Sequence, residues 1–191
     1  MAVTLSELAE LAKSAGLDMT LLPEHQAITG AWGTDRYKDE HGDAKMHVFA
    51  LLQENGEYIT FMAPGLYDLS RCEHRASAIE AMTRVAYVTP FVGYELADDG
   101  AEVRATIEYP IETAALSVEQ LRDSLGLLLQ LVDHYDPVIR HAMKTGTIDL
   151  GLADEDPPAE RSELEELVAK LGGIEALRKL ASGDDGSQGA G

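Results

Sequence analysis

The sequence predicts an α+β fold in which an antiparallel sheet of about five strands carries helices packed against it. Two observations support this class. Hydrophobic residues alternate along short runs that end in turn signals, as they do in strands, and capping boxes precede stretches where hydrophobic residues recur every three or four positions, as in helices. The predicted order is α-β-β-β-α-β-β-α, followed by an additional C-terminal helix.

The first predicted element is a helix from Leu5 to Ala15. Thr4 and Glu7 stand at capping-box spacing, so each side chain would bind the backbone N–H of the other residue. Gly16 follows the last hydrophobic position and suits the left-handed conformation in which helices often end.

Three strands are expected next, at Gln26–Thr34, Met46–Gln53 and Glu57–Ala63. The second and third are joined by Glu54-Asn55-Gly56, and Asn-Gly is a strong hairpin signal because both residues tolerate positive φ. Hydrophobic residues occur on both faces of the second strand, so we expect the sheet to be covered on both faces, at least in part. They are Val48, Ala50 and Leu52 on one face, and Phe49 and Leu51 on the other.

A second helix and two more strands are predicted in the middle of the chain. A capping box at Ser70–Glu73 predicts a helix that runs to about Val85. Phe91–Leu96 and Glu102–Glu112 are predicted strands, and the latter alternates clearly between hydrophobic and polar residues. Its hydrophobic positions are Val103, Ala105, Ile107, Tyr109 and Ile111.

The longest predicted helix begins with a third capping box, Ser117–Gln120, and should form the centre of the core. Pro137 is expected to kink or split it, and Gly146 can end the last segment. Its hydrophobic stripe is wider than one sheet face requires, so we expect part of it to contact a partner chain. The stripe is formed by Leu121, Leu125, Leu128, Val132 and Tyr135, widened by Leu127, Leu129 and Leu131.

The C-terminal part divides by composition. We expect a domain over residues 1–150, an acidic proline-containing linker over 151–161, an amphipathic helix over 162–181 and a disordered tail over 182–191. The predicted helix has a fourth capping box at its start and is interrupted by two glycines. Its hydrophobic stripe, Leu164, Leu167, Val168 and Leu171, needs to be buried somewhere for the helix to be stable.

The charge of the chain restricts its partners. Thirty-four acidic residues against 15 basic ones give a net charge of −19, which repels nucleic-acid phosphates and anionic membranes. The single cysteine, Cys72, excludes an intrachain disulfide, and neither a secretory signal nor a membrane-length apolar run is visible. We therefore expect a soluble cytoplasmic protein that favours basic partners, with no direct nucleic-acid or membrane partner.

No residues are predicted to be catalytic, to bind a metal or to hold a cofactor. His134 and His141 share a helix face, but a metal site needs three or four converging ligands. Cys72 and His74 are of the types found in thiol–imidazole pairs, yet close neighbours on a helix do not face each other, and no orienting group is evident. An ordinary, partly exposed helix end is the better interpretation of the two histidines, and a catalytic thiol is not expected at Cys72.

A partner or dimer interface is instead predicted from hydrophobic residues on helices. The candidates are Leu121, Leu125, Leu128, Met82, Leu167 and Leu171.

Between residues 46 and 146 the sequence resembles the bacterial YbjN family, whose fold is similar to the class I type III secretion chaperones. The order and spacing of several short segments support the resemblance. These are APGLYDLS (63–70), RVAY (84–87), ELADDGAEVRATIEYPIE (95–112), LSVEQL (116–121) and LVDHYDP (131–137).

The resemblance implies an acidic, often dimeric protein that binds other proteins and has no enzymatic activity. It leads to the expectation of a homodimeric, chaperone-like module that binds a client. Two alternatives remain open at this stage: a regulatory or scaffold protein in stress or signalling whose C-terminal helix acts as a cover, and a metal-binding protein or enzyme that uses His134 and His141.

Overall fold

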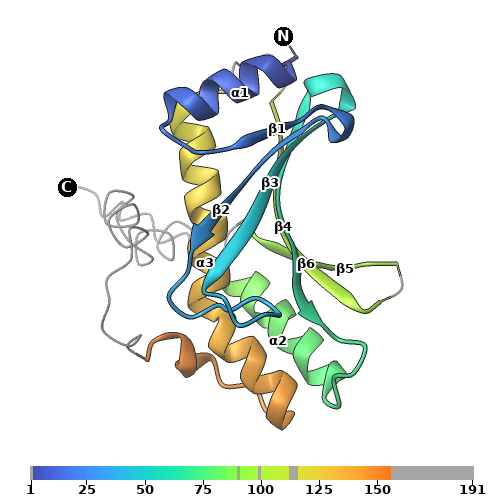
Figure 1. The fold of residues 1–191 in the computed structure, drawn as a ribbon. Coiled ribbons are helices and arrows are strands. Elements are labelled where there is room, and N and C mark those ends of the chain that lie inside the picture. The colour runs from blue at the N-terminus through green and yellow to red at the C-terminus, as the bar shows by residue number, and fades with distance from the viewer. Residues whose placement is uncertain (1, 90, 99, 112–115, 156–191) are drawn as a thin grey trace, which may run out of the picture.

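The computed structural model describes residues 2–89, 91–98, 100–111 and 116–155, and these form a sheet with helices on one of its faces (Figure 1). Six strands make one antiparallel sheet in the order β1-β2-β3-β4-β6-β5. The predicted α+β class is confirmed, with one strand more than expected. The elements are α1 (Leu5–Ser14), β1 (Thr20–Leu22), β2 (Ala27–Gly33), β3 (Lys45–Gln53), β4 (Tyr58–Asp68), α2 (Arg75–Val88), β5 (Gly93–Leu96), β6 (Glu102–Pro110) and α3 (Val118–Thr145), with short 3₁₀ turns η1 (Pro23–His25), η2 (Glu54–Gly56) and η3 (Leu150–Ala153).

Alternation along the strands fixes which face of the sheet meets the helices. In β3, β4 and β6 every second residue is buried, and cross-strand register places these residues side by side. We call the helix-covered face the inner face and the opposite one the outer face. The buried inner-face residues include Met46, Val48, Ala50, Leu52, Ile59, Phe61, Ala63, Val103, Ala105 and Ile107.

Two of the predicted capping boxes are present. The Thr4 hydroxyl accepts from the Glu7 backbone N–H at 3.2 Å, and the Glu7 carboxylate accepts from the Thr4 N–H at 2.8 Å. Ser117 and Gln120 exchange the same pair of bonds at the start of α3.

The capping box predicted at Ser70–Glu73 is wrong. It would start the helix at Arg71, whereas α2 begins at Arg75. The Asp68 carboxylate accepts a hydrogen bond from the Ser70 N–H at 2.7 Å, and this local turn competes with a helix start. The strand β1 was missed because three residues are too short to show a period.

The helix α3 continues through Pro137 without being split, and the left-handed Gly146, with φ of 75°, ends it as predicted. Its wide hydrophobic stripe is accounted for within the chain. The helix packs against the strands β4 and β6 and also against α1, α2 and η3, so several neighbours cover different parts of its surface. No partner chain is needed to bury these side chains.

The first residues of the predicted linker belong to the folded domain. The turn η3 packs against α3, and Ala153 is buried. The Arg36 guanidinium donates to the backbone oxygen of Ala153 at 2.7 Å and also to that of Glu155. The rest of the predicted linker, the predicted helix over 162–181 and the predicted tail lie outside the described residues.

Candidate partner-binding site

A groove lies between the helix α2 and the edge strand β5, and we call it the α2–β5 groove. Its volume is about 340 Å³. The buried stripe of α2 packs into the core, and the helix face that lines the groove shares Met82 with that stripe. The α2 side chains that line it are Ile79, Met82, Thr83 and Ala86, and the opposite wall is formed by the whole of β5, with Val103 of β6.

Large hydrophobic side chains are exposed on α2, on β5 and on the connection between them, and of these Leu96 lines the groove. The exposed fraction is 90% for Tyr87, 78% for Phe91 and 40% for Leu96. Tyr87 lies on the last turn of α2, Phe91 lies in the connection between α2 and β5, and Leu96 ends β5. Exposed hydrophobic residues that gather at one groove are typical of an interaction site, whereas single ones are ordinary.

Phe91 also has an unusual backbone, with φ of +69°. A bulky residue seldom adopts the left-handed conformation, which costs roughly 1 kcal/mol or more. The chain therefore holds an aromatic side chain in solvent at an energetic cost, where glycine would be free of strain.

The strand β5 has one free edge, because it pairs only with β6 among the described strands. A free edge presents backbone N–H and C=O groups that a further strand can pair with. The groove thus combines hydrophobic side-chain surface with backbone hydrogen-bonding groups, the two features by which proteins capture extended segments.

Charge is locally balanced around the groove, although the whole chain is strongly acidic. Glu95 of β5 pairs with Arg104 at 2.6 Å, and Glu80 of α2 pairs with Arg84 one turn further along the helix. These pairs reduce the repulsion that an acidic surface would exert on an incoming acidic partner.

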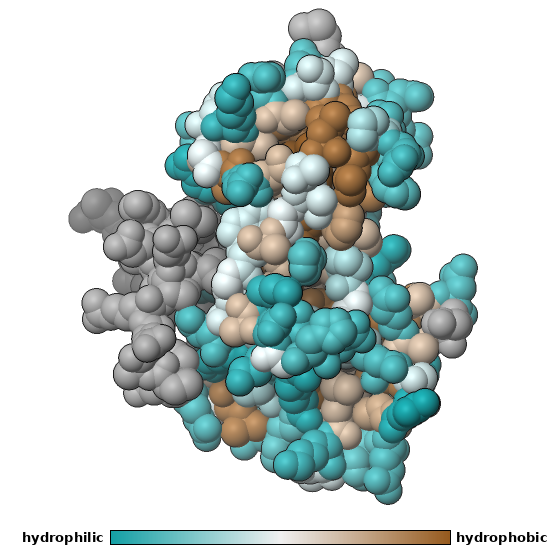
Figure 2. Space-filling model, viewed as in Figure 1, coloured by the Kyte–Doolittle hydropathy of each residue, from teal (hydrophilic) through white to brown (hydrophobic). Residues whose placement is uncertain are grey.

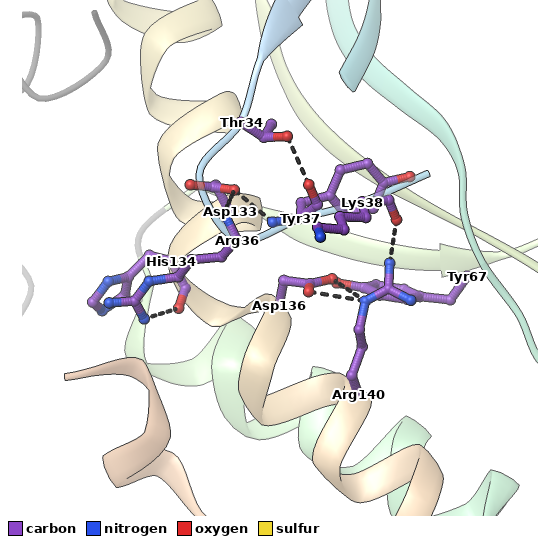
Figure 3. A network of polar contacts seen from close by, with 9 residues as sticks. All are labelled: Thr34, Arg36, Tyr37, Lys38, Tyr67, Asp133, His134, Asp136 and Arg140. Carbon is purple, nitrogen blue, oxygen red and sulfur yellow. Dashed lines mark hydrogen bonds and ion pairs between the residues drawn. The ribbon is translucent and has the colours of Figure 1, made fainter. Parts of the chain in front are cut away.

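A second feature, on the other side of α3, is a network of polar contacts that binds the loop 34–39 to this helix (Figure 3). The Asp133 carboxylate accepts from the backbone N–H groups of Asp35 at 3.2 Å, Arg36 at 2.9 Å and Tyr37 at 2.7 Å. Thr34 donates to the Tyr37 carbonyl at 2.7 Å. One carboxylate thus satisfies three successive N–H groups of a segment that has no regular structure.

Asp136, one turn further along α3, is the centre of the same network. It accepts from the Tyr67 hydroxyl at 3.1 Å and from Arg140 Nε at 2.9 Å, and the Arg140 guanidinium lies 5.5 Å from the centre of the Tyr67 ring (Figure 3). Burial raises the pKa of Asp136 to about 6, against the opposing effect of Arg140. Burial likewise raises the pKa of Tyr67.

The network is a structural device rather than a candidate active site. Its polar groups are directed at the chain's own backbone and at each other, and the groove described above lies elsewhere. Tyr94 stands between the two features: it belongs to the wall of the groove, and burial together with the nearby Asp136 raises its pKa.

The structure places the predicted interface residues mainly in the core. Leu121, Leu125 and Leu128 are at most 2% exposed beneath the sheet and its helices, so they present no surface to a partner. Met82 is 4% exposed, but it does line the α2–β5 groove. Leu167 and Leu171 lie outside the described residues.

The sequence reasoning missed Tyr87 and Phe91. A usable signal existed, because Tyr87 falls outside the buried stripe formed by Ala78, Ala81, Met82 and Val85. A large aromatic residue outside the hydrophobic stripe of an amphipathic helix is expected to be exposed.

Two of the residues considered for other chemistry contact the end of α3 or the residues that follow it. The His141 ring lies 2.9 Å from the Thr147 hydroxyl, and the Cys72 thiol lies 3.6 Å from the Met143 carbonyl. Within the part of the chain that the structure describes, no group of three or more His, Cys, Asp or Glu residues is placed to hold a metal ion. No helix in that part is long and apolar enough to cross a membrane.

Comparison with known proteins concerns the fold. No family model and no curated protein matches this sequence. Among solved structures the chain is similar to YbjN from E. coli, with 12% sequence identity and a TM-score of 0.51 over 71% of this chain and 93% of that chain. The predicted resemblance to the YbjN fold is thereby confirmed.

Two further similar structures are complexes. The HopA1–SchA chaperone–effector complex has 12% identity and a TM-score of 0.42, over 71% of this chain and 89% of that chain. The ExsC–ExsE complex has 17% identity and a TM-score of 0.44, over 73% and 97%. At such identities the likeness concerns the fold, and the partners named are those of the other proteins.

Proposed function

We propose that this protein is a non-enzymatic, chaperone-like module that binds a polypeptide partner in the α2–β5 groove. The observation that carries the proposal is the exposure of Tyr87 and Phe91 beside a hydrophobic groove and a free strand edge. An extended segment could add to β5 through its backbone and place alternate side chains in the groove.

A second copy of the chain is one partner of this kind. Two antiparallel β5 edges can pair about a two-fold axis, which is the commonest symmetry of small oligomers. The ion pairs at Glu80 and Glu95 lower the repulsion between two acidic chains at this position. We therefore expect a homodimer in which a client, when present, engages or competes for the same face.

Light scattering on the full chain tests the dimer. A mass of about twice 20.7 kDa is expected for the wild type and the monomer mass for Tyr87→Ser/Phe91→Ser. Because both side chains are exposed, the substitutions should leave folding intact. The matched control is Leu21→Ser, which removes a 42% exposed leucine from the opposite edge strand. A monomeric wild type at high concentration would remove the dimer from the proposal.

The client is tested by affinity capture from the native host with the same three proteins. Specific proteins should be recovered with the wild type and with Leu21→Ser, and lost with Tyr87→Ser/Phe91→Ser. Equal recovery with all three would show that the groove is not the binding site, whatever the oligomeric state.

A further inference from the structure

Tyr94 connects the α2–β5 groove with the interior of the protein. It lines the groove on β5, and in the strand register it stands opposite Ala105 of β6, which stands opposite Ala63 of β4. Both alanines are buried on the inner face of the sheet, so Tyr94 points to the same side, toward the helices. One side chain thus belongs to the wall of the groove and also reaches into the core.

The hydroxyl group of Tyr94 lies at the buried end of this side chain. Its oxygen is inaccessible to solvent and has no hydrogen-bond partner among the described residues. A buried hydroxyl group without a partner is energetically costly, and such groups are rare in folded proteins. The hydroxyl is therefore a hydrogen-bond donor that is available to a nearby acceptor.

Asp136 of α3 is the charged group that acts on this hydroxyl. Burial raises the pKa of Tyr94, and the next largest contribution to this rise is the negative charge of Asp136, so the two side chains are near each other. Hydrophilic residues cover much of the surface around α2 and β5 in the lower half of Figure 2. Asp136 lies beneath that surface, at 2% exposure, and its charge acts within the interior.

The Asp136 carboxylate has capacity for a further hydrogen bond. The Tyr67 hydroxyl donates to its Oδ1, and Arg140 Nε is shared between Oδ1 and Oδ2. An ionised carboxylate offers about four acceptor positions, so it can also attract the hydroxyl of Tyr94. Protonation removes the negative charge and turns one carboxyl oxygen into a donor, which weakens that attraction.

We propose that the charge of Asp136 sets the position of the Tyr94 ring and thereby makes the α2–β5 groove sensitive to pH. Ionised Asp136 attracts the Tyr94 hydroxyl toward α3 and draws the ring out of the groove. Neutral Asp136 releases the hydroxyl, and the ring moves toward Met82 on the opposite wall. The consequence for binding rests on the proposed function: the groove binds its partner more tightly when Asp136 is ionised.

The groups that surround Asp136 determine the pH range of this change. Burial raises the pKa of Asp136 to about 6, Arg140 and the Tyr67 hydrogen bond oppose this rise, and Asp133 adds to it. Tyr37, from the loop that α3 binds, also interacts with the charge of Asp136. We therefore expect the groove to change between roughly pH 5 and pH 7, one unit on either side of that pKa.

Methyl NMR of the full chain tests the inference in the absence of any partner. The probe is the methyl group of Met82 in the groove, and the reference is the methyl group of Met62 on the outer face of the sheet. The Met82 resonance should shift with a midpoint at about the pKa of Asp136, about 6, and the Met62 resonance should not follow this midpoint. A Met82 resonance that stays constant across this pH range would overturn the inference.

Two variants identify the origin of the shift. Asp136→Asn should abolish it, and because every histidine remains in this variant, a shift that persists would come from a histidine and would overturn the inference. Tyr94→Phe removes only a hydroxyl group without a described partner, so the variant should fold. It should abolish the Met82 shift while the carboxyl carbon of Asp136 still titrates. Equal Met82 shifts in the wild type and in Tyr94→Phe would also overturn the inference.

Tyr67→Phe is the matched control, because it removes the other phenolic hydroxyl that acts on Asp136. The Tyr67 hydrogen bond lowers the pKa of Asp136, so its loss should move the Met82 midpoint to higher pH and leave the shift in place. Loss of the shift in Tyr67→Phe but not in Tyr94→Phe would assign the coupling to Tyr67 and overturn the inference. None of these measurements depends on a partner: a groove that binds nothing would still give the shift, and a missing shift would leave the proposed function intact.

Discussion

The loop 34–39 and the α2–β5 groove are built in opposite ways around the same long helix. In the loop, Asp133 and Arg140 of α3 bind the irregular backbone through four hydrogen bonds. At the groove, Tyr87 and Phe91 stand in solvent beside a strand edge without a described partner. Polar side chains thus fix the backbone in the loop, whereas hydrophobic side chains remain exposed at the groove. The comparison assigns stability to the first region and binding to the second.

The largest expected effect is on the loop side. Asp133→Ala removes the acceptor of three backbone N–H groups, one of them the buried N–H of Tyr37. We expect a loss of about 3 kcal/mol or more in the free energy of unfolding, measured by urea denaturation. Asp133→Asn keeps one oxygen acceptor and should lose less. If the alanine variant loses less than about 0.5 kcal/mol in the free energy of unfolding, the loop does not have the stabilising role assigned to it.

The second largest expected effect is a pH dependence of the free energy of unfolding, caused by Asp136. Burial raises the pKa of Asp136 from 3.8 to about 6, so between these values the folded protein binds more protons than the unfolded chain. Stability should therefore fall as the pH rises from about 4 to about 6, by about 3 kcal/mol for a shift of roughly two pH units.

Asp136→Asn cannot ionise and should lack this contribution. The measurement is the difference in unfolding free energy between the two proteins across this pH range. If the wild type instead gains stability relative to Asp136→Asn as the pH rises, Arg140 dominates over burial.

Arg36→Ala tests the attachment of the segment after α3. It removes the hydrogen bonds to Ala153 and Glu155, and we expect a loss of about 1–3 kcal/mol together with faster proteolysis near η3. Arg84→Ala is the matched control, because it removes an exposed arginine from a surface ion pair that should contribute about 0.3–0.5 kcal/mol. Equal proteolysis of the two variants would contradict the role given to Arg36.

The smallest effect on stability, and of opposite sign, is expected at Phe91, in the connection between α2 and β5. Phe91→Gly relieves the positive φ and should stabilise the monomer by up to about 1 kcal/mol, offset in part by the greater freedom of glycine in the unfolded chain. The same change should weaken self-association measured by light scattering. If the variant loses stability but still dimerises, Phe91 contributes to folding and not to self-association.

Much of the fold was predictable because its signals are local. The boxes at Thr4–Glu7 and Ser117–Gln120, the alternation in β6 and the Gly146 helix end each depend on residues within a few positions of one another. The prediction failed at Ser70–Glu73, where Asp68, just outside the motif, supplies a competing hydrogen bond.

The candidate site was less predictable. The stripe of α3 indicated a hydrophobic surface, but sequence cannot show that α1, α2, η3 and the sheet share in covering it. Leu121, Leu125 and Leu128 therefore lie in the core. The same limit hid the network around Asp133, whose partners stand nearly one hundred positions away in the sequence, as Tyr37 does.

The sequence by itself determined the class of fold, the order of its main elements and the acidic character of the chain, because backbone propensity, capping and charge act locally or sum over residues. Only the tertiary structure decided which hydrophobic residues remain exposed. Packing buries the stripe of α3 and leaves Tyr87 and Phe91 exposed, since exposure depends on every neighbour that the folded chain brings close.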